Sequence, residues 1–113
     1  MTDAERFWSA RPYRRLRWLE GSDGRVVVLR PRLGEGRLGR WVGGLFRDPY
    51  YRIRLDDFGT FVWKACDGET SLDVIAQQMQ KRFGRDVEPA DERLGRFVQK
   101  MLSSRLIAVG TDS

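Results

Sequence analysis

Residues 50–68, YYRIRLDDFGTFVWKACDG, decide the fold because the periodicity of the chain changes within them. As far as Leu55 the pattern is that of a β-strand, in which alternate side chains face opposite sides. From Asp56 onward the apolar residues recur at helical spacing. We expect a first helix that is capped by Asp56 or Asp57 and ends at Gly68.

Two strands are expected before this stretch. Residues 13–20 (YRRLRWLE) form the first, and residues 25–30 (RVVVLR), which are rich in β-branched side chains, form the second. The turn-forming residues 21–24 (GSDG) separate them, which predicts a hairpin. With residues 50–55 as the third strand, the sequence predicts a three-stranded antiparallel sheet.

Two further helices are expected after the first. Thr70 and Asp73 have the spacing of a capping box, which starts the second helix, and Gly84 ends it. Pro89 stands where the first turn of the third helix tolerates proline. The apolar stripes predicted to face the core are Leu72, Ile75, Ala76, Met79 and Phe83 in the second helix, and Leu94, Phe97, Val98, Met101 and Leu102 in the third. Residues 107–109 are expected to form a short closing strand or an extended tail.

A chain of 113 residues is long enough for one domain with one hydrophobic core. We predict an α+β fold of the winged helix-turn-helix type, a three-stranded antiparallel sheet followed by three helices, over residues 13–109. Residues 1–12 and 110–113 are expected to be N-terminal and C-terminal tails.

Residues 31–49 form an insertion between the second and third strands and contain five glycines, which disfavour a stable free helix. We interpret the insertion as a flap that folds back on its own sheet and buries Trp41 and Phe46. The alternative is a short amphipathic helix that binds a membrane surface or a partner.

The composition excludes most enzyme classes. The chain has no histidine and one cysteine, Cys66, which excludes a Ser–His–Asp triad, a Cys–His pair and zinc sites with histidine or all-cysteine ligands. We therefore expect no catalytic residue, no metal and no cofactor, and we interpret Cys66 as a packing residue. A lone cysteine suits a reducing compartment, and we see neither a signal peptide nor a membrane span, so we expect a cytoplasmic protein.

The charge of the chain is uneven. Residues 1–55 contain 13 arginines, no lysine and 6 acidic residues, whereas residues 56–113 contain 8 basic and 10 acidic residues. The excess positive charge therefore lies on the predicted strands. This distribution argues against the standard docking of a helix-turn-helix protein on DNA, in which a helix enters the major groove.

Residues 55–68 resemble the PqqD-like family, whose members carry a strand that ends in leucine, an acidic or asparagine cap, a helix with aromatic residues and a closing Asp-Gly pair. The resemblance continues through residues 70–75 (TSLDVI), 81–84 (KRFG) and 94–107 (LGRFVQKMLSSRLI). It covers the predicted domain and is strongest after the insertion. The insertion, residues 31–49, is longer than the connection found in minimal members.

The resemblance implies a non-catalytic RiPP recognition element, which binds peptides in natural product biosynthesis. In such domains the leader segment of a precursor peptide adds as a further strand to the third strand, in the cleft next to the third helix. The domain acts as a peptide chaperone that presents the precursor to a radical-SAM or other modifying enzyme. We expect this chain to act in trans.

The residues themselves agree with peptide binding. An exposed strand edge presents N–H and C=O groups with which a peptide can pair, and a cleft beside it would have basic walls and an apolar floor. We therefore expect an extended acidic peptide with one or two apolar anchors, although the helix cations alone would equally suit a solvated helix face. The predicted peptide-binding residues are Tyr51, Arg52, Ile53 and Arg54 on the third strand and Arg93, Arg96, Phe97, Lys100 and Met101 on the third helix.

Three alternatives stay open. One is a winged-helix DNA-binding protein, although DNA phosphates would repel Glu88, Asp91 and Glu92 at the start of the third helix, so we expect no nucleic-acid partner. Another is an assembly subunit that binds a partner protein through Trp41 and Phe46 of the flap. The third is a homodimer, since an edge strand can pair with its own copy.

Overall fold

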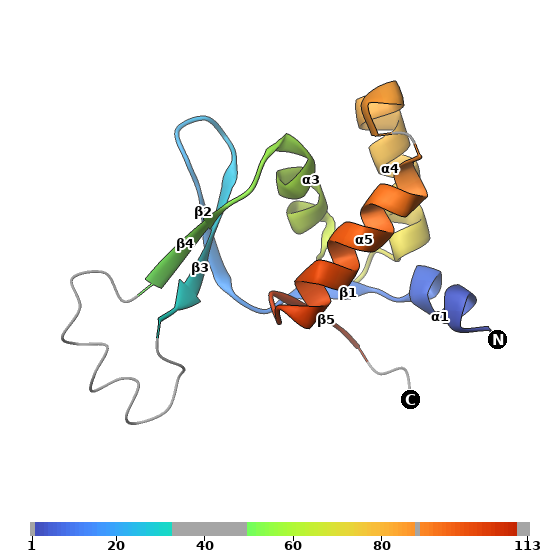
Figure 1. The fold of residues 1–113 in the computed structure, drawn as a ribbon, viewed down its shortest axis with the longest axis horizontal. Coiled ribbons are helices and arrows are strands. Elements are labelled where there is room, and N and C mark those ends of the chain that lie inside the picture. The colour runs from blue at the N-terminus through green and yellow to red at the C-terminus, as the bar shows by residue number, and fades with distance from the viewer. Residues whose placement is uncertain (1, 33–49, 88, 111–113) are drawn as a thin grey trace. The chain divides into compact units, whose positions relative to one another are not determined.

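The computed structural model describes residues 2–32, 50–87 and 89–110. The chain divides into two compact units: the sheet unit, Leu16–Asp57, and the helical unit, Met1–Arg15 with Phe58–Ser113. The described residues form an α+β arrangement, as predicted (Figure 1).

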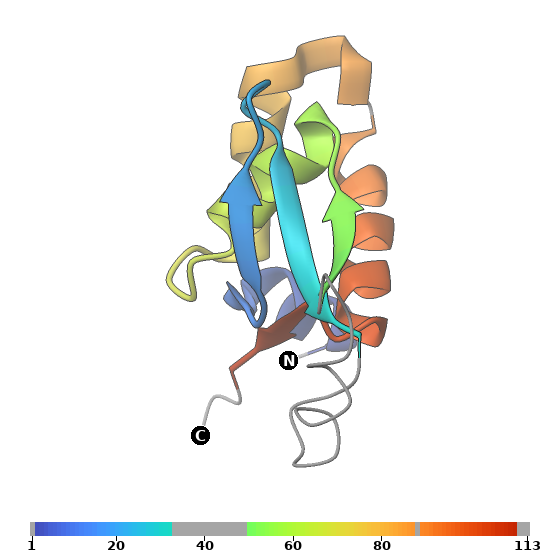
Figure 2. The ribbon, with the colours of Figure 1, turned by 90° about the vertical axis from the view of Figure 1, so that its left-hand side faces the viewer.

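The sheet unit contains three strands, β2 (Arg17–Glu20), β3 (Val26–Pro31) and β4 (Tyr50–Arg54). Both outer strands run antiparallel to β3, which lies in the middle (Figure 2). The β2–β3 turn is closed by a hydrogen bond of 2.8 Å from the N–H of Gly21 to the carbonyl of Arg25. Gly24 in this turn has a φ of 81°, which glycine adopts without strain. The predicted three-stranded antiparallel sheet is confirmed.

This sheet has two different faces. Val26 and Val28 of β3 are fully buried. The register pairs Val28 with Trp18 of β2 and Ile53 of β4, and directly opposite residues share a face, so this inner face is apolar at its centre. The opposite surface, which we call the outer face, carries the side chains of Arg17, Leu19, Val27, Leu29, Arg52 and Arg54, with Pro31 and Tyr50 at one end.

Four α-helices lie in the described residues, α1 (Asp3–Ser9), α3 (Asp57–Ala65), α4 (Leu72–Phe83) and α5 (Ala90–Ser103), and a short 3-10 helix, η1 (Gly84–Val87), follows α4. Helices α4 and α5 pack side by side in the helical unit (Figure 1). None of the described helices combines the length and apolar character that crossing a bilayer requires.

The core of the helical unit is built largely from the predicted stripes of α4 and α5. The buried side chains of this unit are Pro12, Val62, Trp63, Cys66, Leu72, Ile75, Met79, Ala90, Leu94, Val98, Met101, Leu106 and Ile107. The other predicted stripe residues, Ala76, Phe83, Phe97 and Leu102, are only half-buried. The predicted stripes therefore include both residues that are buried in the core and residues that lie at its border.

A second sheet of two strands joins distant parts of the helical unit. β1 (Pro12–Arg14) pairs antiparallel with β5 (Ile107–Val109), and Tyr13 lies opposite Ala108. Residues 107–109 were expected to form either a short closing strand or an extended tail, and they form the strand.

The prediction of one continuous strand over residues 13–20 is wrong, because this segment is divided between the two sheets. Its first part is held in the helical unit, where the Arg14 guanidinium donates hydrogen bonds of 3.1 and 2.9 Å to the carbonyls of Trp63 and Lys64. A cation suits this position, because the C-terminal carbonyls of a helix carry partial negative charge. These contacts join residues far apart in the chain, so no local pattern predicts them.

Helix α1 forms where a tail, residues 1–12, was expected. Thr2 caps it, since the hydroxyl accepts a hydrogen bond of 3.1 Å from the backbone N–H of Glu5. The chain then reaches α4, whose Leu72 N–H donates to the carbonyl of Ala10 at 3.0 Å. The described residues thus contain four α-helices where three were expected, and the first precedes the strands.

The start of α4 differs from the predicted capping box, because Ser71, and not Thr70, is the N-cap residue. Thr70 belongs to a turn around Asp67, whose carboxylate accepts hydrogen bonds from the N–H groups of Glu69 and Thr70 at 2.9 Å and from the Thr70 hydroxyl at 3.1 Å. These bonds hold the pKa of the Asp67 carboxyl below its usual value. The predicted end of this helix at Gly84 is confirmed, with a φ of 58°.

The bounds of the other two predicted helices are close to expectation. α3 begins at Asp57, directly after Asp56, and it ends at Ala65. These two aspartates are the residues predicted as alternative caps. A turn then leads to Gly68, the predicted end, which has a φ of 80° and donates its N–H to the carbonyl of Pro12 at 2.8 Å. Pro89 is the N-cap of α5, immediately before its first turn.

Replacing Leu94 by alanine should lower the free energy of unfolding by about 2–5 kcal/mol, because this side chain is fully buried and its removal leaves a cavity. Leu19→Ala is the matched control, since Leu19 is 39% exposed, and its loss should be less than about 1 kcal/mol. Urea unfolding followed by circular dichroism measures both changes. Equal losses would contradict the assignment of Leu94 to the core.

Candidate functional site

β4 lies at one edge of its sheet, since β3 is the only strand in the described residues that pairs with it. The N–H of Leu55, next to β4, donates to the carbonyl of Val26 at 3.0 Å. In an antiparallel pair the groups that point to the neighbouring strand recur at every second residue. Ile53 therefore directs its backbone groups toward β3, whereas Arg52 and Arg54 direct theirs to the opposite side, along the edge.

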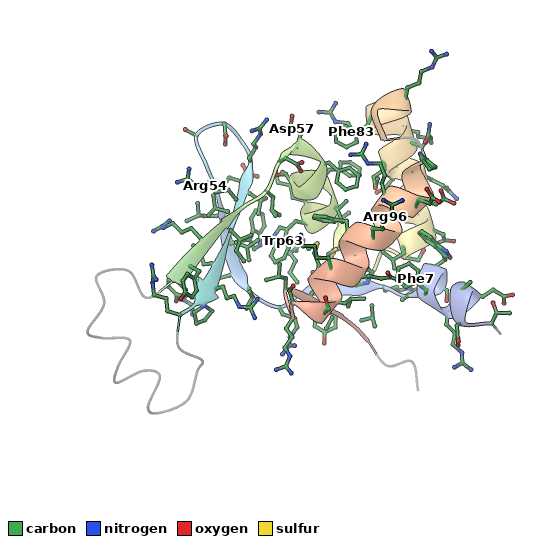
Figure 3. The ribbon with its side chains drawn as sticks, viewed as in Figure 1. Phe7, Arg54, Asp57, Trp63, Phe83 and Arg96 are labelled. Carbon is green, nitrogen blue, oxygen red and sulfur yellow. The ribbon has the colours of Figure 1, made fainter. Side chains whose placement is uncertain are left out.

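The predicted side chains of β4 divide between the two faces of the sheet. Arg52 and Arg54 are exposed on the outer face, and Figure 3 shows Arg54 extending away from the strand. Ile53 is half-buried on the inner face. Tyr51 shares that face and is 51% exposed, and its ring centroid lies 4.5 Å from the guanidinium carbon of Arg32. The four residues therefore flank the edge from both sides and do not line one surface.

The predicted surface residues of α5 share one side of the helix, at positions i, i+3, i+4 and i+7: Arg93, Arg96, Phe97 and Lys100. The three basic side chains are exposed, and Phe97 is half-buried. Arg96 lies 3.6 Å from Glu92 in an exposed ion pair of a kind that contributes little to stability. A basic stripe with one aromatic ring thus runs along the helix.

Phe97 belongs to a cluster of phenylalanine rings in the helical unit. Its centroid lies 5.5 Å from that of Phe58, with the rings edge to face. Phe83 also belongs to the cluster, since its ring centroid lies 6.2 Å from that of Phe58 and 5.6 Å from that of Phe61. The guanidinium carbon of Arg93 lies 5.5 Å from the Phe58 centroid, so a predicted binding cation packs on the cluster. This contact was not predicted, because it joins α3 to α5.

Met101 differs from the other predicted residues of α5. It is 3% exposed and belongs to the buried stripe of the helix with Ala90, Leu94 and Val98. It supports α5 from within the core. The groove predicted between β4 and α5 stays a prediction, since these elements belong to different units. The predicted flap residues Trp41 and Phe46 lie outside the described residues.

α5 carries opposite charges at its two ends. Asp91 and Glu92 lie in its first turn and Lys100 in its last, which complements the helix dipole. A recognition helix presents its N-terminal residues to the bases of DNA, and here phosphates would meet two carboxylates. The N-terminal end of α5 is therefore unsuited to DNA, and its basic side chains lie along its length.

The described ranges offer no cluster of three or more histidine, cysteine, aspartate or glutamate side chains that could hold a metal ion. Cys66 is fully buried in the helical unit. Burial raises the pKa of its thiol from 9.0 to about 12, although the positive charge of Arg14 opposes part of this shift. The nucleophilic thiolate is therefore scarce at neutral pH.

Both candidate elements lie within one region of similarity to known proteins. The family model of coenzyme PQQ synthesis protein D (PqqD) matches residues 48–107, slightly more than half of the chain. The chain belongs to the PqqD family. The match to PqqD includes β4, α3, α4 and α5 and leaves out α1, β1, β2 and β3, and it confirms the family expected from the sequence. No curated protein and no solved structure matches the chain.

Replacing Cys66 by alanine should remove part of the loss of stability at alkaline pH. The pKa of the thiol is 9.0 in the unfolded chain and about 12 in the folded protein. The contribution of the thiol to the free energy of unfolding is therefore constant below pH 9.0 and falls as the pH rises further. The free energy of unfolding from urea titrations should therefore decline more steeply above pH 9.0 in the natural chain than in the variant. Parallel curves would contradict the raised pKa.

Proposed function

We propose that the chain is a non-catalytic peptide-binding protein that presents the leader segment of a precursor peptide to a modifying enzyme, such as a radical-SAM enzyme. The observation that carries this proposal is the match to the PqqD family over residues 48–107, because the family serves biosynthesis and the match includes both β4 and α5. We further assign the helices α3, α4 and α5 to a winged helix-turn-helix arrangement. Binding and presenting a peptide require no catalytic side chain.

The peptide binds, in this proposal, by adding a strand to the edge of β4. Strand addition takes its affinity from main-chain hydrogen bonds and its specificity from the side chains beside them. The direction of the backbone groups of Arg52 and Arg54 supports this mode, because both residues direct N–H and C=O groups away from β3.

The division of β4 side chains between two faces defines the peptide that would fit. An added strand also alternates, so every second peptide residue meets the outer face and the residues between them meet the inner face. Carboxylates on the outer side would pair with Arg52 and Arg54, and apolar side chains on the inner side would contact Tyr51 and Ile53. We therefore propose a leader with alternating acidic and apolar residues.

The proposal assigns the basic stripe of α5 to the same peptide. Arg93, Arg96 and Lys100 would attract further carboxylates, and Phe97 would contact an apolar anchor. Arg93 is partly oriented by its contact with the Phe58 ring, which reduces the entropy that it loses on binding. Met101 contributes by supporting the helix from the core.

A synthetic peptide of alternating glutamate and leucine tests this function. Titrated into the isotope-labelled protein, it should shift the amide NMR signals of β4 and slow the hydrogen exchange of the Arg52 and Arg54 amides, because these would pair with the peptide backbone. The double variant R52E/R54E should weaken binding by about tenfold or more, since two attractive charge contacts become repulsive.

The matched control is R11E/K81E, which changes the net charge equally at two exposed positions outside β4 and α5. It should bind the peptide within about twofold of the natural chain, because distant surface charges are screened. A peptide of the same composition with its glutamates and leucines in separate blocks should bind more weakly. Unchanged β4 signals, or equal binding of both peptides, would refute strand addition. Binding of random duplex DNA at physiological salt would favour the DNA-binding alternative instead.

A further inference from the structure

The outer face of the sheet unit has a regular pattern of charge that strand addition at β4 does not explain. The register aligns two rows of three residues across β2, β3 and β4 in turn, Arg17–Leu29–Arg52 and Leu19–Val27–Arg54. Each row has an aliphatic residue on the central strand and at least one arginine on an outer strand. The pattern therefore extends over all three strands.

The aliphatic side chains of the outer face keep part of their surface exposed. Leu19 is 39% exposed, and Val27 and Leu29 are half-buried. On the inner face, by contrast, Val26 and Val28 are fully buried. A partner that covers the outer face would remove apolar surface from water, which favours association.

Two arginines of the outer face, Arg17 and Arg54, lack the neutralising partner that Arg25 has in the same unit. Arg17 and Arg54 are exposed and form no ion pair with any described residue. Arg25 in the same unit, by comparison, lies 2.9 Å from the carboxylate of Asp57. The outward-facing positions of the three strands include no aspartate or glutamate. The face therefore favours an anionic partner, and guanidinium groups pair well with carboxylates.

The width of the face matches one α-helix. β2 and β4 are two strand spacings apart, about 9.5 Å, and an α-helix with its side chains is about 10–12 Å across. A helix lying along β3 would place an apolar stripe on Val27 and Leu29. Acidic residues on its two borders would then reach Arg17 on β2 and Arg54 on β4.

We propose that the outer face is a docking surface for an acidic amphipathic helix of a partner protein. Arg17, Leu19, Val27 and Leu29 lie outside the residues matched to the PqqD family, so this surface is built mainly by strands that the family match leaves out. It differs from strand addition, which uses the backbone edge of β4, because the helix contacts mainly β2 and β3. The two proposed sites share the side chain of Arg54.

Other occupants fit the outer face less well. Single-stranded nucleic acids stack their bases on aromatic side chains, whereas the centre of this face is aliphatic and its one aromatic residue, Tyr50, lies at the end of β4. A second copy of the same face would bring arginines against arginines. Residues 33–49 of this chain contain three arginines and two acidic residues, so this segment lacks the negative charge that the face favours.

The test uses the full chain and a synthetic helical peptide with a leucine stripe bordered by glutamates. Titration should shift the methyl NMR signals of Leu19, Val27 and Leu29. R17E should weaken binding by about tenfold, because an attractive charge becomes repulsive, and its charge-matched control R11E should leave affinity unchanged. Leu19→Ser should also weaken binding, whereas Val74→Ser, at a residue of similar exposure on α4 (37% against 39%), should not.

The same variants separate this proposal from peptide binding at β4. R17E should lose the helical peptide but retain the peptide of alternating glutamate and leucine, because β3 separates Arg17 from the edge of β4. If the helical peptide fails to bind while the alternating peptide binds, only the docking surface is refuted. If the helical peptide binds while the alternating peptide does not, only strand addition is refuted.

Any one of four results would overturn the docking surface. The first is unchanged methyl signals of Leu19, Val27 and Leu29 at saturating peptide. The second is equal binding of a helical peptide of the same composition with its leucine stripe scrambled, which would leave only non-specific charge attraction. The third is an NMR contact in the free protein between these methyl groups and the side chains of Trp41 or Phe46, which would show that the chain covers the face itself. The fourth is tighter binding of single-stranded RNA that is lost in R17E, which would reassign the face to nucleic acid.

Discussion

The register of β3 between its two neighbours is the constraint on which the sheet unit depends. Val28 lies opposite Trp18 on one side and Ile53 on the other, so the centre of the inner face is apolar across all three strands. The same register necessarily gathers Arg17, Arg52 and Arg54 on the opposite surface. A shift of one residue in either pairing would bring arginine to the buried face, at a large cost in desolvation. Core formation and the basic outer face are therefore two results of a single alignment.

Much of the helical unit could be predicted because its signals are local. Gly84 ends a helix through its own backbone conformation, and the buried positions of α4 and α5 follow the spacing of the sequence itself. The errors concern structure that depends on distant partners. Residues 13–20 have the composition of one strand, but contacts of Arg14 with the end of α3 and pairing with β5 hold the first part elsewhere. Helix α1 was missed because it has only seven residues, although Thr2 and Glu5 at its start have the spacing of a capping box.

The candidate site shows the same division. Strand alternation alone placed Arg52 and Arg54 on one side of β4, and helical spacing grouped Arg93 with Lys100. Whether an individual side chain reaches solvent was harder to predict, since Met101 and Phe97 have similar sequence contexts but differ in burial. The alignment of Arg17 with Leu29 was missed, because only the pairing of β2 with β3 brings them together. Residue type and periodicity therefore predict which groups are present, and long-range pairing determines which of them act together.

The pairing of β1 with β5 also imposes an order on folding during synthesis. All residues of the three strands of the sheet unit have been translated once Arg54 has been added, when α5 does not yet exist. The helical unit, in contrast, cannot close until Ile107–Val109 have left the ribosome, because these residues are the partners of a strand made near the start. In the interval the apolar stripes of α3 and α4 are exposed on the nascent chain, which is when a molecular chaperone or an aggregating neighbour would encounter them.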